Sequence, residues 1–193
     1  DAAGNPLLGR APHLRFYRDQ VNSKRRVLAL AEPSLRLQAG VGPRLDFTCF
    51  YNGHNWRHTA LGFGWTHSYE IRVVPAWVGG ARQVYLLWQG DYLLGPCDTN
   101  GYLAVFGEQA RLLEAADGSW TLSNRTHDVY RFTEAGQLES IADRNANTLA
   151  LALAGFAGEP DLRVKKLVQC TAPAGAGTLA FDYAPNSARL RKA

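Results

Sequence analysis

Short runs in which apolar and polar residues alternate fill residues 35–106, and they limit the possible folds of this chain more than any other feature. Three clear runs cover residues 45–51, 69–73 and 102–106. Alternation of this kind places the apolar side chains on one face of a β-strand. Turn signals such as Gly79-Gly80, Gly90-Asp91 and residues 98–101 predict further strands with connections of about two to five residues, and connections this short favour antiparallel pairing. The sequence therefore predicts an all-β fold that begins as an antiparallel β-meander.

Glycine and proline residues predict where individual strands begin and end. Gly79-Gly80 is a hairpin signal, so we expect residues 84–88 to return along the preceding strand. Pro75 is expected to close that preceding strand, because proline has no N–H to donate to a neighbour. An earlier strand is expected over residues 35–39.

Residues 1–34 fit two descriptions, and the pattern does not decide between them. A polar segment rich in Gly and Pro is followed by a basic run that ends at Arg26. Either an extended arm with one strand or a short helix over residues 17–30 is compatible with this order, so we expect an arm or a plug-like segment. The chain has no Met and starts at Asp1, which favours a processed or excised piece of something longer, with a mature secreted domain as the alternative.

Composition narrows the classes of function. Hydrophobic residues make up 46% of the 193 residues and charged residues 20%, which indicates a packed core rather than a disordered chain. The net charge is +4, and the basic residues are spread out rather than interleaved with aromatics in a stripe, so we expect no nucleic-acid partner. No apolar run approaches the ~20 residues of a membrane span, and no signal peptide is visible.

The cysteines do not suggest a disulfide scaffold. There are three, Cys49, Cys97 and Cys170, and they are far apart in the sequence. Cys49 occupies an inward position of its expected strand, so we expect a buried thiol. A Cys97–Cys170 disulfide remains an alternative.

A repeated pattern is expected from residue 107 onward. The pairs Arg111-Leu112, Gln137-Leu138, Arg163-Val164 and Arg189-Leu190 follow one another at intervals of 26 residues. Residues 147–151 also match residues 177–181, with a slip of four positions. A fixed period of this size indicates a unit of strand, turn and strand that is stacked repeatedly. No such unit can bury its own apolar face, so the last one predicts an open edge after Leu190.

The chain is therefore expected to have three segments. Residues 1–34 form the arm or plug-like segment, residues 35–106 an antiparallel sheet domain, and residues 107–193 degenerate repeats of about 26 residues.

The densest group of potential metal ligands is Cys49, His54, His58 and His67. The spacing of His54 and His58 would place both imidazoles on one face of a helix, and with Cys49 they could bind zinc. However, the segment between them lies in a loop between expected strands, where this spacing argument does not apply. We therefore favour histidines in a solvated loop and expect no metal site, with His67 serving a structural role.

Acidic residues in the repeats are expected to cap turns. Asp143, Asn145 and Asn147 offer alternate oxygen atoms, as at the start of a calcium loop, but the Gly and the distal Glu of an EF-hand are missing. Aspartate in such a turn more often accepts hydrogen bonds from its own backbone. No nucleophile elbow, phosphate loop or dinucleotide fingerprint occurs, so we expect no catalytic residue and no cofactor.

Aromatic residues offer an alternative function. Trp77, Trp88 and Trp120 could form a platform for a glycan if they shared an exposed face. Aromatic residues in strands more often pack in the core or against a sheet, which is the interpretation we favour.

The stretch Leu61-Gly62-Phe63-Gly64-Trp65-Thr66-His67-Ser68-Tyr69-Glu70 joins two of the alternating runs, and Tyr51-Asn52 precedes it. The two glycines permit backbone conformations that a side chain would forbid. This order of rare residue types resembles the start of the shell of RHS/YD-repeat proteins. The preceding strand, which begins at Gly42, also fits that family.

A second part of the resemblance lies in the repeats. Tyr130, Gly136, Leu138, Asp143 and Asn147 are spaced as in a YD repeat, and Tyr183 belongs to the next one. Two departures are that Ala146 replaces the usual Gly of the turn and that the Tyr-Asp order is reversed at Asp182-Tyr183. The residues that carry the resemblance as structural motif positions are Tyr51, Gly62, Gly64, Trp65, His67, Tyr69, Tyr130, Leu138, Asp143, Asn147 and Tyr183.

The resemblance implies a function as well as a fold. Proteins of this family wind their repeats into a hollow, spiralling β-shell that encloses a toxin domain or other cargo, and they act in secretion systems, insecticidal toxin complexes or bacterial competition. This chain is then expected to be a non-catalytic segment of the wall, secreted or extracellular, with the remainder of the shell, its cargo and secretion-system components as partners. A surface β-module that binds glycan or protein through exposed aromatics is the alternative.

Overall fold

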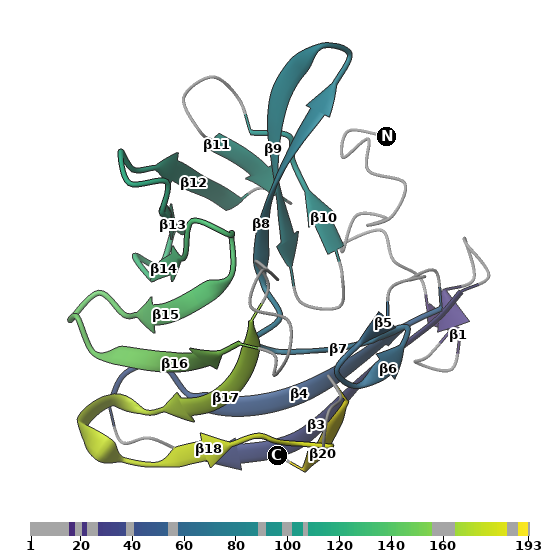
Figure 1. Cartoon of the computed structure of the whole chain (residues 1–193), viewed down its shortest axis with the longest axis vertical. Helices are drawn as coiled ribbons and strands as arrows, with labels where there is room; N and C mark the ends of the chain where they lie inside the picture. The colour runs from purple at the N-terminus through teal and green to yellow at the C-terminus, as the bar shows by residue number, and fades with distance from the viewer. Residues whose placement is uncertain are drawn as a thin grey trace.

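The computed structural model describes an all-β chain of antiparallel sheets, none of which closes on itself (Figure 1). It describes residues 16–17, 21–22, 27–37, 41–53, 58–88, 92–97, 102–105, 108–155, 165–184 and 189–192. Within these ranges, residues 16–37, 58, 92–94, 102–105, 108–109, 175 and 192 are described by their backbone alone. The expected fold class is confirmed at this level. The described part contains no helix long and apolar enough to cross a membrane.

The first sheet, called here the N-terminal sheet, is built around one long hairpin. Its strands are β1 (Phe16–Tyr17), β2 (Val21–Asn22), β3 (Val27–Leu37), β4 (Leu45–Asn52) and β7 (Trp65–His67). β3 pairs with β4 along nearly its whole length, from Ala29 opposite Asn52 to Leu37 opposite Leu45. The alternative of a helix over residues 17–30 is therefore wrong for the described residues. The expected division after residue 34 falls inside β3.

A second hairpin follows the N-terminal sheet. It consists of β8 (Arg72–Val78) and β9 (Ala81–Trp88), and β10 (Tyr92–Leu94) adds to its far side. The hairpin expected at Gly79-Gly80 is confirmed, and both glycines have the positive φ angles, 59° and 81°, that a two-residue hairpin turn requires. A smaller hairpin joins β5 (His58–Thr59) to β6 (Gly62–Phe63).

Pro75 does not close the strand before it, contrary to expectation. It lies within β8 and is paired with Val84, and the strand starts at Arg72 rather than at Tyr69. The physical reason is position: β8 is the edge strand of its sheet in the described part of the chain, and an edge strand tolerates a missing N–H.

The remaining strands form the repeat sheet, in which each strand pairs with the next one along the chain. In the described residues its strands are β11 (Tyr102–Val105), β12 (Glu108–Glu114), β13 (Trp120–Ser123), β14 (Val129–Phe132), β15 (Leu138–Ala142), β16 (Thr148–Ala154), β17 (Lys166–Thr171) and β18 (Thr178–Ala180). β11 pairs with β12, so residues 102–105 belong to this sheet rather than to the preceding segment. A short hairpin of β19 (Asp182–Tyr183) and β20 (Leu190–Lys192) comes last.

Four turns between described strands of the repeat sheet share one hydrogen-bond pattern. In each, the first residue donates its N–H to the carbonyl of the fifth, and the fourth donates to the carbonyl of the first, as in Asp143–Asn147. The fourth residue has positive φ; these residues are Gly118, His127, Gly136 and Ala146, with φ between 63° and 83°. A side-chain oxygen also accepts the N–H of the fifth residue in all four turns. Each turn is therefore specified by residues within it.

The spacing of the repeats is not constant, which corrects the expected 26-residue period. Equivalent turns start 18 residues apart at Ala115 and Thr133, 19 apart at Asn124 and Asp143, and 29 apart at Asp143 and Ala172. Leu112 and Leu138 are 26 residues apart but are not equivalent positions of a repeat. They lie on β12 and β15, which are separated by three antiparallel pairings and run in opposite directions. The third pair of the series, Arg163-Val164, lies outside the described residues.

The expected correspondence between residues 147–151 and residues 177–181 is confirmed. Leu149 and Leu151 of β16 match Leu179 of β18 and Phe181 after it, on segments two strands apart, and all four side chains are buried. The strands differ in length and connection, but the inward positions remain equivalent.

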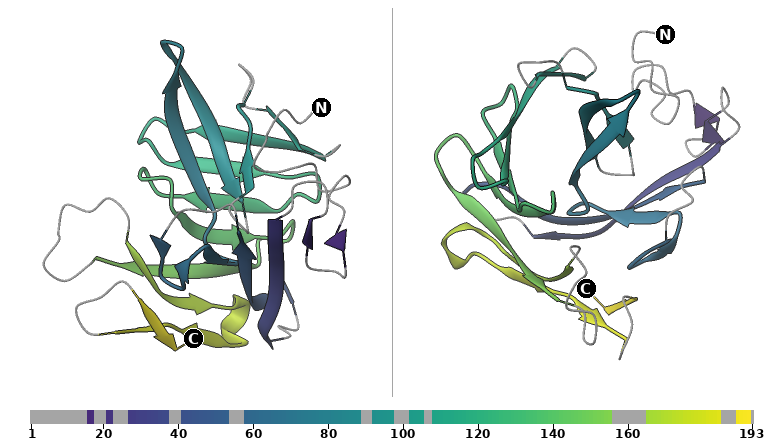
Figure 2. Two further views of the ribbon diagram at one scale, coloured as in Figure 1. Left: turned by 90° about the vertical axis from the view of Figure 1, so that its right-hand side faces the viewer. Right: turned by 45° about the horizontal axis from the view of Figure 1, so that its top comes forward.

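A single core lies between the repeat sheet and the N-terminal elements. The repeat sheet curves, and the β8–β9 hairpin lies on its concave side (Figure 2). Buried side chains come from both partners and include Leu45, Phe47, Ile71, Val73, Leu86, Leu112, Leu122, Phe132, Leu138, Leu149, Leu167 and Leu179. The first repeats therefore bury their apolar face against β4, β8 and β9 as well as against one another.

Candidate functional site: a buried polar junction

Residues 61–70, called here the motif segment, are fixed by close packing of the backbone. Gly64 has a φ of 74°, and a Cβ atom added there would lie 2.8 Å from the ring of Tyr51. The Tyr51 ring in turn packs on Trp65, with ring centroids 5.2 Å apart. Gly62 also has positive φ, at 111°, but open space surrounds it. The motif therefore needs glycine at position 64 for both conformation and space, and at position 62 for conformation alone.

The chain leaves β7 through a turn whose polar groups are buried. The N–H of Ser68 donates to the carbonyl of Thr48, and the N–H of Thr48 donates to Oγ of Ser68 over 2.7 Å. The N–H of Glu70 donates to the carbonyl of His67 over 2.9 Å. The N–H of Tyr69 donates to Nδ1 of His67 over 3.3 Å. Residues 66–70 are all buried, so these hydrogen bonds replace those that water would supply.

His67 lies at the centre of this junction. Its side chain forms a three-ring cluster with Phe47 of β4 and Phe181 after β18, whose ring centroids lie 5.4 and 6.1 Å from that of the imidazole. Nε2 is 4.0 Å from Oε2 of Glu70. Burial lowers the pKa of His67, although the Glu70 charge acts in the opposite direction. The imidazole is therefore neutral near pH 7.

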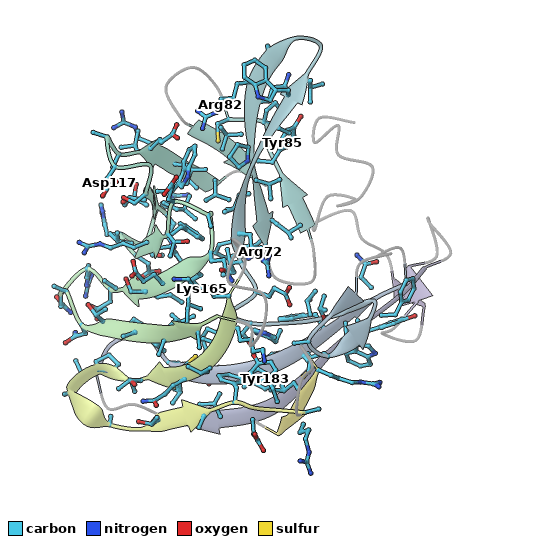
Figure 3. All side chains as sticks on the ribbon, viewed as in Figure 1. Arg72, Arg82, Tyr85, Asp117, Lys165 and Tyr183 are labelled. Carbon is cyan, nitrogen blue, oxygen red and sulfur yellow. The ribbon has the colours of Figure 1, made fainter. Side chains whose placement is uncertain are left out.

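Glu70 is close to His67, to Arg72 of β8 and to Tyr183 of β19. Its Oε1 is 3.5 Å from the guanidinium of Arg72, which is partly exposed. Burial, followed by the nearby Glu70 charge, raises the pKa of Tyr183 to about 12. The hydroxyl of Tyr183 donates to the carbonyl of Leu167, and the Lys166 ammonium lies 5.3 Å from its ring centre. Arg72 and Tyr183 are labelled in Figure 3.

Two polar side-chain atoms of the junction are buried without a hydrogen-bond partner. They are the hydroxyls of Thr66 and Tyr69. Burial raises the pKa of Tyr69, and it also raises the pKa of the Cys170 thiol, which is fully buried nearby. Both groups therefore remain uncharged over the ordinary range of pH.

A second contact ties the repeat sheet to β8. The N–H of Val73 donates to the carbonyl of Gly136 over 2.8 Å, and a Cβ atom on Gly136 would lie only 2.2 Å from the Val73 carbonyl oxygen. The neighbouring Gln137 is buried, and its amide bonds both the N–H and the carbonyl of Lys165, at 2.6 and 2.8 Å. One turn therefore holds both the β8–β9 hairpin and the start of β17.

The structure brings together only part of the residue set that the sequence singles out. Tyr51, Gly64, Trp65, His67, Tyr69 and Tyr183 lie around the junction, whereas Tyr130 packs edge-on against Trp88 and Leu138 lies in the core. Asp143 and Asn147 form a turn, where the expected capping is confirmed: Oδ1 of Asp143 accepts the N–H groups of Asn145 and Asn147. The Asn147 side-chain amide also donates to Oδ2 of Asp143, and this bond, followed by the two backbone bonds, lowers the pKa of Asp143.

Several residues of the junction could not be identified from the sequence. Phe181 and Cys170 reach it from the last repeats, and no spacing rule relates them to His67. Gln137 and Gly136 were noted in the sequence, as parts of the 26-residue pairs and of the YD-type spacing. Nothing in the sequence indicated their contacts with Lys165 and Val73.

The proposed group of metal ligands is described only in part. Cys49 lies opposite His67 in the pairing of β4 with β7, but His54 and the side chain of His58 lie outside the described residues. Within the described ranges, no three His, Cys, Asp or Glu side chains gather as metal ligands would. Cys49, Cys97 and Cys170 are thiols, so the alternative disulfide between Cys97 and Cys170 is not formed.

The three tryptophans that could form a glycan platform do not share one exposed face. Trp77 is 76% exposed near the tip of the β8–β9 hairpin, while Trp120 is 4% exposed. The guanidinium of Arg82 covers Trp120 at 5.4 Å and also pairs with Glu114. Trp88 is half-buried against Tyr130.

Comparison with known proteins adds no further identification. No protein-family model matches the chain, and no curated protein matches it.

Proposed function

We propose that this chain is the starting segment of an RHS/YD-repeat shell, a non-catalytic wall that encloses a toxin or other cargo in a secreted polymorphic toxin or toxin complex. One observation carries the proposal: strands of the repeat sheet follow one another in chain order, and their inward side chains share one apolar face. A sheet of this kind lengthens by adding hairpins, and each addition extends the same inner face.

The N-terminal elements supply what such a wall needs at its beginning. The first unit of a stack has no earlier unit to cover it, so something else must bury its apolar face. Here β4 and the β8–β9 hairpin do so, and the motif segment joins them to residues near the last described strands. The remaining shell, its cargo and secretion-system components are the proposed partners, and the proposed location is extracellular.

The geometry of β18 allows a direct test of strand addition. The N–H of Phe181 donates to the carbonyl of Val168, and the N–H of Ala172 donates to the carbonyl of Gly177. The backbone polar groups of Gly177 and Phe181 therefore face β17. Because hydrogen-bonded and non-bonded pairs alternate in an antiparallel ladder, the backbone N–H groups of Thr178 and Ala180 point away from β17. An Ala180→Pro substitution removes an outward donor without removing a hydrogen bond to β17, and Ala180→Gly keeps the donor as a matched control.

Light scattering with circular dichroism on the 193-residue chain measures the effect. We expect the wild type and the Ala180→Gly variant to self-associate through the open edge, and Ala180→Pro to be largely monomeric with the same β-rich spectrum. A wild type that is monomeric and unfolds cooperatively would contradict the proposal. Electron microscopy of the complete gene product is then expected to show a hollow particle, and a solid one would also contradict it.

A second candidate function is favoured by Trp77. This side chain is exposed, and residues 76–81 at the tip of its hairpin carry no charge. Large exposed aromatic residues frequently mark binding surfaces. A glycan array probed with the wild type and with Trp77→Ala tests this function. Binding by the wild type that is lost in the variant supports a glycan-binding module, and equal signals from both proteins exclude Trp77 as the contact.

A further inference from the structure

The junction around His67 connects parts of the chain that are distant in sequence. Phe47 and the motif segment come from the N-terminal sheet, whereas Phe181 follows the last strand of the repeat sheet. The rings of Phe47 and Phe181 also touch each other, with centroids 5.3 Å apart. The imidazole therefore belongs to a cluster of three rings that joins the N-terminal sheet to the residues after β18.

The imidazole is held in its neutral form by geometry. Nδ1 accepts the N–H of Tyr69, so the single ring proton of the neutral form is on Nε2. A second proton can enter only at Nδ1, where it abolishes that acceptor and leaves the buried N–H of Tyr69 without its partner. The charged ring would also have to remain against two phenyl rings at 6% exposure.

One neighbouring group can offset part of that charge, but it is not within hydrogen-bond distance. Glu70 is the nearest carboxylate, but its oxygen is 4.0 Å from Nε2 and its other oxygen faces Arg72. The titratable or charged groups around the imidazole are Glu70 on its own segment, Arg72 on β8, Asp46 and Cys49 on β4, Cys170 on β17, and Tyr183 on β19. Arg72 opposes protonation, and the two groups from the repeat side, Cys170 and Tyr183, stay neutral.

We propose that His67 is an acid-sensitive lock, and that its protonation releases residues 178–183 from the N-terminal sheet. The lock is a property of the junction itself, and it does not depend on whether the chain forms part of a shell. Its consequence is that mild acid opens the last described repeat first, while the β12–β13 end of the repeat sheet remains closed.

The direction of the pH effect follows from linkage. The pKa of His67 is lower in the folded state than its ordinary value of 6.5, so the open state binds more protons. Stability of the closed junction is therefore complete above pH 6.5 and falls as the pH drops below it. At pH 5.5, one unit below the open-state pKa, the open population rises about tenfold if the closed state stays neutral.

Hydrogen exchange measured by mass spectrometry tests the lock at pH 7.0 and pH 5.5, after correction for intrinsic exchange rates. The reporter is the peptide that contains the Phe181 amide, which donates to Val168, and the reference peptide covers β12 and β13. We expect protection of the reporter to fall at pH 5.5 in the wild type, by up to about tenfold, with no change in the reference. An equal change in both peptides would mean general destabilisation and would overturn the proposal.

Two variants separate His67 from the other histidines. His67→Gln keeps a polar side chain that cannot ionise, and its reporter protection is expected to be the same at both pH values. His127→Asn removes an exposed histidine from a turn position with positive φ, a conformation that Asn tolerates, and it should keep the wild-type response. A wild-type pH response in His67→Gln would overturn the proposal.

If the His67→Gln variant does not fold, a second measurement tests whether His67 is the acid-sensitive group. An NMR titration of the wild-type imidazole is expected to give a His67 pKa below 6.5 in the closed state. A His67 pKa at or above 6.5 in the folded protein would overturn the lock.

Discussion

The turns of the repeat sheet and the turn of the motif segment both reverse the chain direction, but different contacts stabilise them. A repeat turn such as Asp143–Asn147 closes with hydrogen bonds among five consecutive residues. The motif turn instead relies on Thr48, which is 20 residues from Ser68, and on Phe181, which is more than 100 residues from His67. Repeat turns are therefore encoded locally and can be used many times, whereas the motif turn depends on contacts with distant parts of the fold.

The largest test of this comparison is at Gly136, where a repeat turn also contacts a distant strand. Gly136→Ala places a Cβ atom 2.2 Å from the Val73 carbonyl and strains a positive φ, so we expect a loss of about 3 kcal/mol or more in the free energy of unfolding. Urea denaturation measures this loss.

Gly118→Ala is the matched control for Gly136→Ala. Gly118 occupies the same turn position with a similar φ, but its Cβ atom would meet only the flexible side chain of Glu134. A loss of about 1 kcal/mol is expected there. Equal losses at the two glycines would contradict the distinction between local and long-range turns.

A smaller effect is expected for the buried amide of Gln137. Gln137→Ala removes two hydrogen bonds to the backbone of Lys165, 28 residues away, and should cost about 1.5 kcal/mol in the free energy of unfolding. Gln169→Ala removes only an exposed, local bond to Thr171, so its cost should be under about 0.5 kcal/mol. Thermal unfolding that ranks the two variants in reverse order would show that the long-range contact is not the stronger one.

A stabilising substitution tests whether residues within a repeat turn determine its stability. Ala146 has a φ of 63°, a conformation that costs a residue with a Cβ atom roughly 1 kcal/mol. Ala146→Gly should therefore raise the free energy of unfolding by about 0.5–1 kcal/mol. Ala150→Gly, in the middle of β16, should lower it by a similar amount. A stability gain in both variants would argue that relief of strain at Ala146 is not the cause.

The smallest effect is expected at the surface contact between the β8–β9 hairpin and β12. Both nitrogens of the Arg82 guanidinium fork contact Glu114, at 2.7 and 2.8 Å, and this contact, led by the side-chain hydrogen bond, lowers the pKa of Glu114. The pair is exposed and therefore screened by solvent, so Glu114→Gln should cost about 0.3 kcal/mol at low salt and less at high salt. A loss above about 1 kcal/mol that is independent of salt would show that the hairpin is held mainly by this pair.

The same contrast explains what the sequence could predict. The Gly79-Gly80 hairpin and the Asp143 turn are determined by neighbouring residues, and both were expected correctly. The constant 26-residue period was wrong because strand and loop lengths vary between repeats while only the inward positions are kept. Pro75 was misplaced because its tolerance depends on β8 being an edge strand, which is a property of the sheet.

The candidate site was less predictable than the fold. The motif residues could be recognised, and a structural role for His67 was expected, but nothing in one sequence places Phe181 beside His67. The partners of Gln137 and Gly136 are equally distant from them along the chain. Such contacts follow from the curvature of the whole repeat sheet and not from local preference.

The pairing of Phe47 with Phe181 also has a consequence for synthesis of the protein. Phe181 is made 134 residues after Phe47, so at roughly 5–20 residues per second a ribosome needs on the order of 10 s to supply the partner. During this interval β4 and its hairpin have emerged with their apolar face uncovered, while the repeat strands are added one by one. The nascent chain therefore passes through an exposed, incompletely packed stage, and chaperones are expected to bind it there.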